Sequence, residues 1–194
     1  HIMGDAYEKK RDQDLLALMD NGTTSLAGAG TTLTMGHIAA SRALLLGNAT
    51  SAGGPAPMSH VVVIHPFQEL DIVDVITPLA PSLVTSGTAQ GIQGPTGSLV
   101  NEVLTKYSIG RLFGMPIITD GNYTIDGSGD VKAGAFAMGR SGAIIYASAR
   151  EPDIEPERDA SLRGWEMNYV GRYGVGNYLN GWTVELYTDA STPA

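Results

Sequence analysis

The run Val61-Val62-Val63-Ile64 is the segment that most restricts what this chain can fold into. Four consecutive β-branched residues favour a strand, and a strand without polar alternation is typical of one buried on both faces. We therefore expect a strand over 59–65 in the interior of a sheet. Pro66 stands where a helix tolerates proline, and a helix is expected to follow because apolar residues recur at helical spacing: Phe67, Leu70, Val73 and Ile76.

The remaining pattern mixes helices and strands without regular alternation, which predicts the α+β class. Glycine, proline and small polar residues separate the elements and mark loops. Further helices are expected over 5–20, 33–46 and 99–107, and further strands over 109–119, 131–138, 143–149, 163–170 and 182–187. Between them we expect a loop over 22–32, a long loop over 80–98, a hairpin tip over 120–130 and a charged surface segment over 150–159.

The charge balance argues against nucleic acid as a partner. The chain has 12 Lys and Arg against 20 Asp and Glu, a formal net charge of −8, and no basic run. Affinity for DNA or RNA depends on basic groups that neutralise phosphates, so we expect no tight nucleic-acid binding. Charged residues make up only 16% of the chain, which leaves a surface of small and apolar groups suited to contact with copies of itself.

Other classes of function are restricted by what the sequence lacks. It contains no cysteine, which excludes disulfides, thiolate metal sites and cysteine nucleophiles. No apolar stretch is long enough to span a bilayer, so no membrane partner is expected, and no motif predicts a cofactor. Residues 1–4, His-Ile-Met-Gly, are typical of a cloning scar, and we expect natural residues upstream of Asp5.

The segment from Asp120 to Asp130 has the alternating oxygen side chains of a calcium loop. The odd positions hold Asp120, Asn122, Thr124 and Asp126. The sixth position is Ile125 instead of glycine and the twelfth is Val131 instead of glutamate, so the match is incomplete. A hairpin turn explains the same residues, and a calcium-binding module remains one alternative.

Ser141 and His65 are the residues on which a hydrolase interpretation depends. Ser141 lies in Gly139-Arg140-Ser141-Gly142, but Ala143 replaces the last glycine of the nucleophile-elbow pattern. His65 directly precedes a helix start, where a structural role is more common. No spacing links either residue to a third catalytic group, so a hydrolase fragment remains a second alternative.

Aromatic residues and arginines concentrate in the last segment of the chain. Trp, Tyr and Arg are enriched at interface hot spots, but they are also good strand residues, so core packing explains them equally well. The candidates for an assembly interface are Arg163, Trp165, Tyr169, Arg172, Tyr173 and Trp182.

The order of segments from Ser59 onward resembles the major capsid proteins of tailed bacteriophages. The strand over 59–65 leads into a helix, as in that family, and a strand like Ile109-Gly110-Arg111-Leu112-Phe113 follows after a gap. A stretch of small residues over 133–146 holds an Ala-x-x-x-Gly-x-x-Gly-Ala-Ile pattern, and the closing strands carry Tyr-Gly-Val-Gly at 173–176. This likeness is at the level of the fold and covers most of the chain in short pieces.

The resemblance implies the Hong Kong phage type of capsid fold, which encapsulins share. It implies an axial domain with a mixed sheet flanked by helices, and part of a peripheral domain with a helix and long strands. On this basis we expect residues 5–58 to be the helical part of the peripheral domain and the way into the axial domain, residues 59–150 to be the axial domain, and residues 151–194 to be closing strands of the peripheral domain.

The resemblance also implies a structural protein and not an enzyme. Subunits of the family form pentamers and hexamers that tile an icosahedral shell around the genome, so the expected partner is a copy of the chain itself, with contacts through the loop over 80–98. The expected location is the virion, after synthesis in the host bacterial cytoplasm. The family's N-terminal arm and the extended hairpin before this region have no match here, so we expect this piece to be soluble and not to close shells alone.

Overall fold

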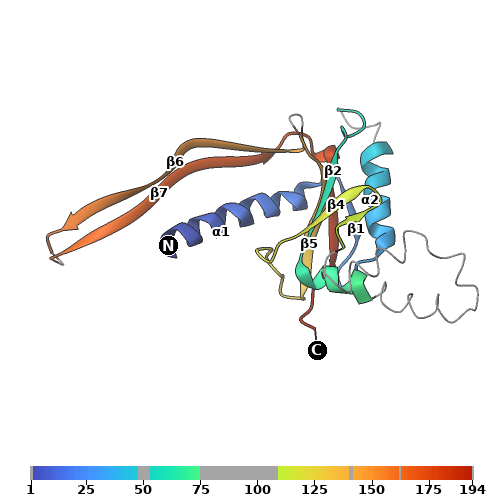
Figure 1. The fold of residues 1–194 in the computed structure, drawn as a ribbon, viewed down its shortest axis with the longest axis horizontal. Coiled ribbons are helices and arrows are strands. Elements are labelled where there is room, and N and C mark those ends of the chain that lie inside the picture. The colour runs from blue at the N-terminus through green and yellow to red at the C-terminus, as the bar shows by residue number, and fades with distance from the viewer. Residues whose placement is uncertain (1, 48–52, 75–108, 140–141, 162, 194) are drawn as a thin grey trace, which may run out of the picture.

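The computed structural model describes residues 2–47, 53–74, 109–139, 142–161 and 163–193. They form a body built on a six-stranded sheet and, projecting from it, a two-stranded ribbon with a helix alongside (Figure 1). The predicted α+β class is confirmed by this mixture. The predicted loop over 80–98 and helix over 99–107 lie outside the described residues.

The sheet of the body is mixed and has the order β1-β8-β5-β2-β4-β3. Its strands are β1 (Thr24–Ala27), β2 (His60–Ile64), β3 (Arg111–Leu112), β4 (Met115–Thr119), β5 (Asp130–Ala137) and β8 (Thr183–Asp189). β1 pairs with β8 in parallel, as β2 does with β4, whereas the β2–β5, β5–β8 and β3–β4 pairs are antiparallel. The last strand, β8, therefore lies inside the sheet, between β1 and β5.

β2 is the buried strand that its β-branched run predicts. All five of its residues are buried, and Val62 and Ile64 are fully enclosed. Helix α2 (Met35–Gly47) contributes Ile38 and Leu45 to the same core, and a helix over 66–74 contributes Ile72. Such continuous burial explains why the strand shows no polar alternation.

Gly134 of β5 lets the chain's first segment reach the sheet. The side chain of Met19, in the short helix η1 (Ala17–Asn21), lies so close that a Cβ on Gly134 would come within 2.6 Å of the methionine Sδ. Ala133 and Ala135, which flank Gly134 and point to the opposite face of the sheet, belong to the core cluster that includes α2. Two segments from the first 47 residues, η1 and α2, therefore pack on opposite faces of β5.

The single kinked strand predicted over 109–119 is wrong, because these residues form a tight hairpin. β3 and β4 pair with Leu112 opposite Met115, so the turn has only two residues. These residues, Phe113 and Gly114, both have positive φ, 51° and 79°. Two-residue hairpins with right-handed strand twist need this backbone, and phenylalanine at the first position gives no sequence signal for it.

Two predicted loops also differ from the structure. The loop expected over 22–32 contains β1, whose small polar residues pair with the edge of β8, with Thr24 opposite Val184. The segment over 120–130 is not a hairpin tip, since β4 and β5 lie on opposite sides of β2. It crosses the end of β2 instead, where the Asp120 N–H donates to the Ile64 carbonyl oxygen at 3.0 Å.

The ribbon consists of β6 (Ile144–Asp159) and β7 (Gly164–Asn177), paired antiparallel. The charged segment over 150–159 is exposed, as predicted, but it is a strand, because β6 continues through it with irregular register between Ser148 and Asp153. A strand with a free edge tolerates proline, so Pro156 can lie within β6 opposite Met167. The domain boundary expected at residue 150 falls inside this strand.

A long helix, α1 (Ile2–Leu16), runs beside the ribbon and continues into η1 (Figure 1). It has no buried residues, in contrast to α2, and begins within the four residues interpreted as a cloning scar. The resemblance places the family's extended hairpin before this region of the chain, where the sequence offers no match. The structure contains an extended hairpin, but between β5 and β8.

Candidate assembly interface

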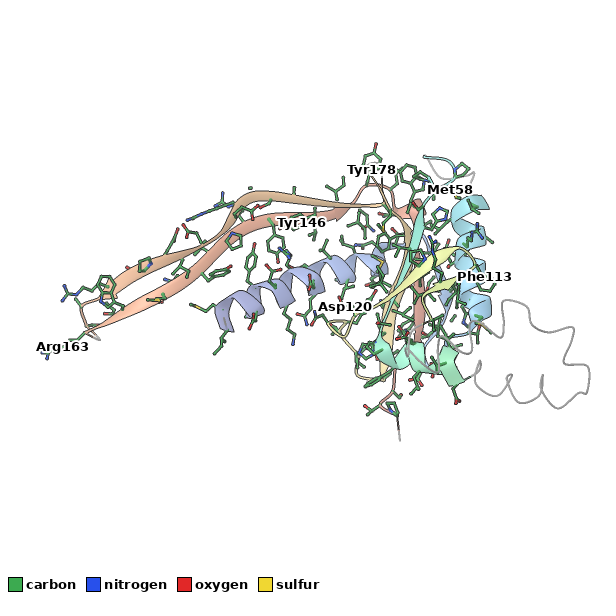
Figure 2. All side chains as sticks on the ribbon, in the orientation of Figure 1. Met58, Phe113, Asp120, Tyr146, Arg163 and Tyr178 are labelled. Atoms are coloured by element: carbon green, nitrogen blue, oxygen red, sulfur yellow. The ribbon has the colours of Figure 1, made fainter. Side chains whose placement is uncertain are left out.

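A cluster of four tyrosines, one from α1 and three from the ribbon, holds α1 against the ribbon. The ring of Tyr7 packs edge-on against Tyr169 and Tyr173, with centroids 5.5 and 5.7 Å apart, and Tyr146 stacks on Tyr173 at 5.9 Å. Figure 2 shows Tyr146 reaching from the ribbon toward the helix. Gly171 leaves room for this cluster, since a Cβ there would lie 2.5 Å from the Tyr7 hydroxyl oxygen.

Polar groups of α1 complete the contact. The Tyr173 hydroxyl donates to Asp14 Oδ2 at 2.7 Å, and the Lys10 ammonium donates to Asp14 Oδ1 at 2.6 Å. The hydrogen bonds from Lys10 and Tyr173 lower the pKa of Asp14. The bond to this carboxylate raises the pKa of Tyr173 to about 12. At neutral pH the Asp14 carboxylate is therefore ionised and the Tyr173 phenol is neutral, which are the states that form this hydrogen bond.

The two faces of the ribbon differ in chemistry. Alternate residues of a strand point to opposite faces, and directly paired residues share a face. Because Tyr169 and Tyr173 face α1, the α1 side of the outer ribbon holds apolar groups, namely Ile154, Pro156, Trp165 and Met167. We call these four residues the distal apolar face. The reverse side of the same stretch holds acidic groups, namely Asp153, Glu155, Glu157 and Glu166.

The distal apolar face is open to solvent. Trp165 is 68% exposed, Met167 56% and Ile154 50%. Figure 1 shows the ribbon continuing past the N-terminal end of α1, so the helix covers only the part nearer the body. Large apolar side chains gathered on one exposed face mark an interaction surface more often than isolated ones do.

The six predicted interface residues fall into three groups. Arg163, Trp165 and Arg172 are exposed, and Figure 2 places Arg163 at the far tip of the ribbon. Tyr169 and Tyr173 are half-buried against α1. Trp182 is buried in the body, where its indole N–H donates to the Gly54 carbonyl oxygen at 3.0 Å. An interface role stays a prediction, and the exposed group is the one a neighbour could reach.

Sequence reasoning did not include Ile154, Pro156 and Met167 among the candidates. The signal was present as an alternation of apolar and acidic residues along 153–157, the pattern of a half-buried strand. Two prolines and a surplus of charge over 150–159 favoured a surface segment instead.

His65 serves as a helix cap. Its Nδ1 accepts from the Phe67 N–H at 3.2 Å, and its own N–H donates to Gln68 Oε1 at 2.9 Å. The bond from the His65 N–H to Gln68 is the half of a capping box that the third helical residue supplies, and Pro66 occupies the first helical position. Burial lowers the pKa of His65. The hydrolase alternative gains no support from it, and its other residue, Ser141, lies outside the described residues.

The carboxylates over 120–130 are used inside the protein. Asp126 Oδ1 accepts from the N–H groups of Ser128 and Asp130, and its Oδ2 accepts from the Tyr187 hydroxyl at 2.8 Å. These bonds lower the pKa of Asp126. In the part of the chain that the structure describes, no group of three His, Asp or Glu side chains could hold a metal ion. The calcium alternative is therefore not supported.

A hollow of about 270 Å³ lies between the end of α1 and β5. It is lined by Gln13, Leu16, Ala17, Asp20, Thr124, Asp126, Asp130 and Lys132. Lys132 donates to Asp20 at 2.5 Å, and Asp130 Oδ1 accepts from the Gly30 N–H at 2.7 Å. Its charged groups thus hold η1 and the β1 region to β5, which is a structural task.

Comparison with known proteins places these features in a family. A family model described as phage capsid protein matches residues 2–184. A chain from Mycobacterium phage Che8 has a similar fold, with a TM-score of 0.66 and 21% identity over 94% of this chain. A chain from the capsid structure of the cyanophage P-SCSP1u gives a TM-score of 0.57 and 14% identity over 97%.

The present chain spans 60% of the Che8 chain and 64% of the cyanophage chain. Comparison with curated proteins gave no match. Among the residues that the structure describes, none of the helices has both the length and the apolar character needed to cross a membrane.

Proposed function

The chain belongs to the phage capsid protein family, and from this premise we propose that it is a structural subunit of a viral shell. The family match over residues 2–184 carries the proposal, and the fold shared with the Che8 chain supports it. The resemblance inferred from the sequence is thereby confirmed at the level of the family. The partner is a copy of the chain itself, and the location is the virion.

In this proposal the subunits form pentamers and hexamers of an icosahedral shell. A contact that joins two different surfaces of one protein generates rings when the rotation closes. The six-stranded body corresponds to the axial domain, and α1 with the ribbon corresponds to the peripheral domain. This assignment keeps β6 in one unit, unlike a division at residue 150. The subunits are made in the host bacterial cytoplasm.

We further propose that the chain has no catalytic activity and does not bind the genome tightly. The candidate catalytic histidine is used as a helix cap, and the charged groups around the hollow beside β5 bind one another. The acidic reverse side of the ribbon and a net charge of −8 oppose contact with phosphates.

Sedimentation velocity and negative-stain electron microscopy on a concentration series of the chain test the assembly proposal. We expect association that increases with concentration and yields rings of five or six copies. A strictly monomeric chain at millimolar concentration would contradict it. Fluorescence anisotropy with labelled duplex DNA at roughly 0.15 M ionic strength tests the second claim, and saturable, salt-sensitive binding there would contradict it.

A further inference from the structure

The tyrosines between α1 and the ribbon form a chain of touching rings that begins at the protein surface. Tyr146 is 42% exposed, and its ring stacks on Tyr173 with an interplanar angle of 25° (Figure 2). Tyr173 is half-buried and also contacts the ring of Tyr7, 5.7 Å away on α1. Aromatic rings at these separations can exchange an electron, so oxidation of the exposed ring can reach the two rings behind it.

Tyr173 has surroundings that favour the loss of an electron. A phenol loses its proton when it is oxidised, because the oxidised phenol is a strong acid. The Tyr173 hydroxyl already donates to Asp14 Oδ2 at 2.7 Å, so the acceptor for this proton is in place. The ring of Tyr146 has the opposite surroundings, because the Arg11 guanidinium carbon lies 5.9 Å from its centroid and a positive charge opposes the removal of an electron.

We propose that this cluster is an oxidative modification site, at which a carbon–carbon bond forms between Tyr173 and Tyr7. The oxidant is hydrogen peroxide, activated by a haem peroxidase and reduced to two molecules of water. Each phenol gives up one electron and one proton, and the two radicals couple through ring carbons next to their hydroxyl groups. The hydrogen on each coupled carbon then moves by way of solvent to the oxygen of the same ring. The chain gains one bond and loses two hydrogen atoms.

The consequence of this bond is a permanent link between α1 and β7. α1 has no buried residues, and its contact with the ribbon depends on the tyrosine rings and on the Asp14 carboxylate. A covalent link between positions so distant in sequence also restricts the unfolded chain. Both rings belong to one chain, so the inference does not depend on whether the chain assembles.

Oxidation of the full chain with a haem peroxidase and hydrogen peroxide tests the proposal. The reaction is run at the lowest concentration of the sedimentation series, which limits bonds between copies. We expect a single-chain product that lacks the mass of two hydrogen atoms, shows dityrosine fluorescence, and yields a joined peptide containing Tyr7 and Tyr173. Amide hydrogen exchange in α1 should be slower in this product than in the untreated chain.

Tyr187 provides the matched control. Its hydroxyl also donates to a carboxylate, Asp126 Oδ2 at 2.8 Å, but its ring lies against the Lys132 ammonium and contacts no aromatic ring of the described residues. Tyr7→Phe and Tyr173→Phe each keep the ring and remove the hydroxyl that forms the radical, so the fold is expected to persist, which circular dichroism checks. We expect both to abolish the bond and Tyr187→Phe to leave its yield unchanged.

The outcomes also separate this inference from the proposed function. A bond that survives Tyr7→Phe, or a joined peptide that contains Tyr146 in place of Tyr7, would overturn it. A product in which Tyr187 is coupled as often as Tyr173, or in which all bonds join two copies, would overturn it as well. A chain that stays monomeric and still forms the bond between Tyr7 and Tyr173 would contradict the assembly proposal alone.

Discussion

The antiparallel pair β6–β7 lies between the two strands of the antiparallel pair β5–β8 along the chain, yet the surroundings of the two pairs are opposite. The ribbon is an excursion between two strands of the body, because the chain leaves β5, runs out along β6, returns along β7 and enters β8. In β5, six of eight residues are buried, whereas β6 has none. Backbone pairing is thus sufficient to define a strand, but burial decides whether the strand contributes to the core or remains available to a neighbour.

The difference has a thermodynamic meaning. Burial of apolar side chains supplies most of the favourable free energy of folding, and an isolated two-stranded hairpin is marginally stable in water. The ribbon therefore depends on the tyrosine contacts with α1 over its inner part. Its outer part gains comparable support only when another surface covers it.

The same substitution in the two regions should produce the largest contrast. Ile64→Ala removes a fully enclosed side chain of β2 and should cost about 2–5 kcal/mol of the free energy of unfolding. Ile154→Ala removes a side chain that is half exposed on the ribbon and should cost less than about 1 kcal/mol. Urea unfolding followed by circular dichroism measures both, and similar costs would show that the ribbon is as firmly packed as the body.

A glycine pair sharpens the dependence of the ribbon on α1. Gly171→Ala would place a Cβ against the ring of Tyr7, so the ring must move and α1 should lose about 1–3 kcal/mol of its docking free energy. Gly174→Ala, three residues further along β7, meets no atom within 4 Å and serves as the control. Hydrogen exchange should speed up in α1 for the first variant alone. Equal protection in both variants would contradict the tyrosine contact.

The smallest expected effect concerns pH. Because the folded-state pKa of Asp14 is lowered, its contribution to docking is present above the unfolded value of about 3.9 and is lost as pH falls through the folded value. NMR signals of the Tyr7 ring should therefore shift toward those of an exposed tyrosine below about pH 4, while Ile64 methyl signals stay as they are. Asp14→Asn should show the weakened contact already at neutral pH, and an unchanged Tyr7 signal in that variant would contradict the role of Asp14.

The parts of the fold that could be predicted from the sequence are those where burial leaves a periodic trace. The β-branched run of β2, the helix that follows it and α2 were located correctly, since apolar spacing reports directly on core contact. β1 and the outer part of β6 could not be located in the same way. β1 exists through pairing with the distant strand β8, and the outer part of β6 exists through pairing with β7. The polar residues of β1 and the charges and prolines of β6 are otherwise typical of loops.

The candidate interface was predicted in part for a related reason. Composition drew attention to Trp165 and Arg163, which are exposed, but also to Trp182, which is buried in the body. An aromatic residue on a strand has the same sequence signature in a core and at an interface. The structure separates the two cases, because Trp182 is buried in the body and Trp165 is exposed on the ribbon.

The interior position of β8 has a consequence for the timing of folding. Thr24 pairs with Val184, which lies 160 positions later in the sequence, and β5 likewise needs β8 as its neighbour. Contacts this distant in sequence close slowly, and during translation they cannot form before the C-terminal strand leaves the ribosome. A nascent chain therefore holds an incomplete sheet until β8 has been synthesised, so the body is completed only after the ribbon that it carries has left the ribosome.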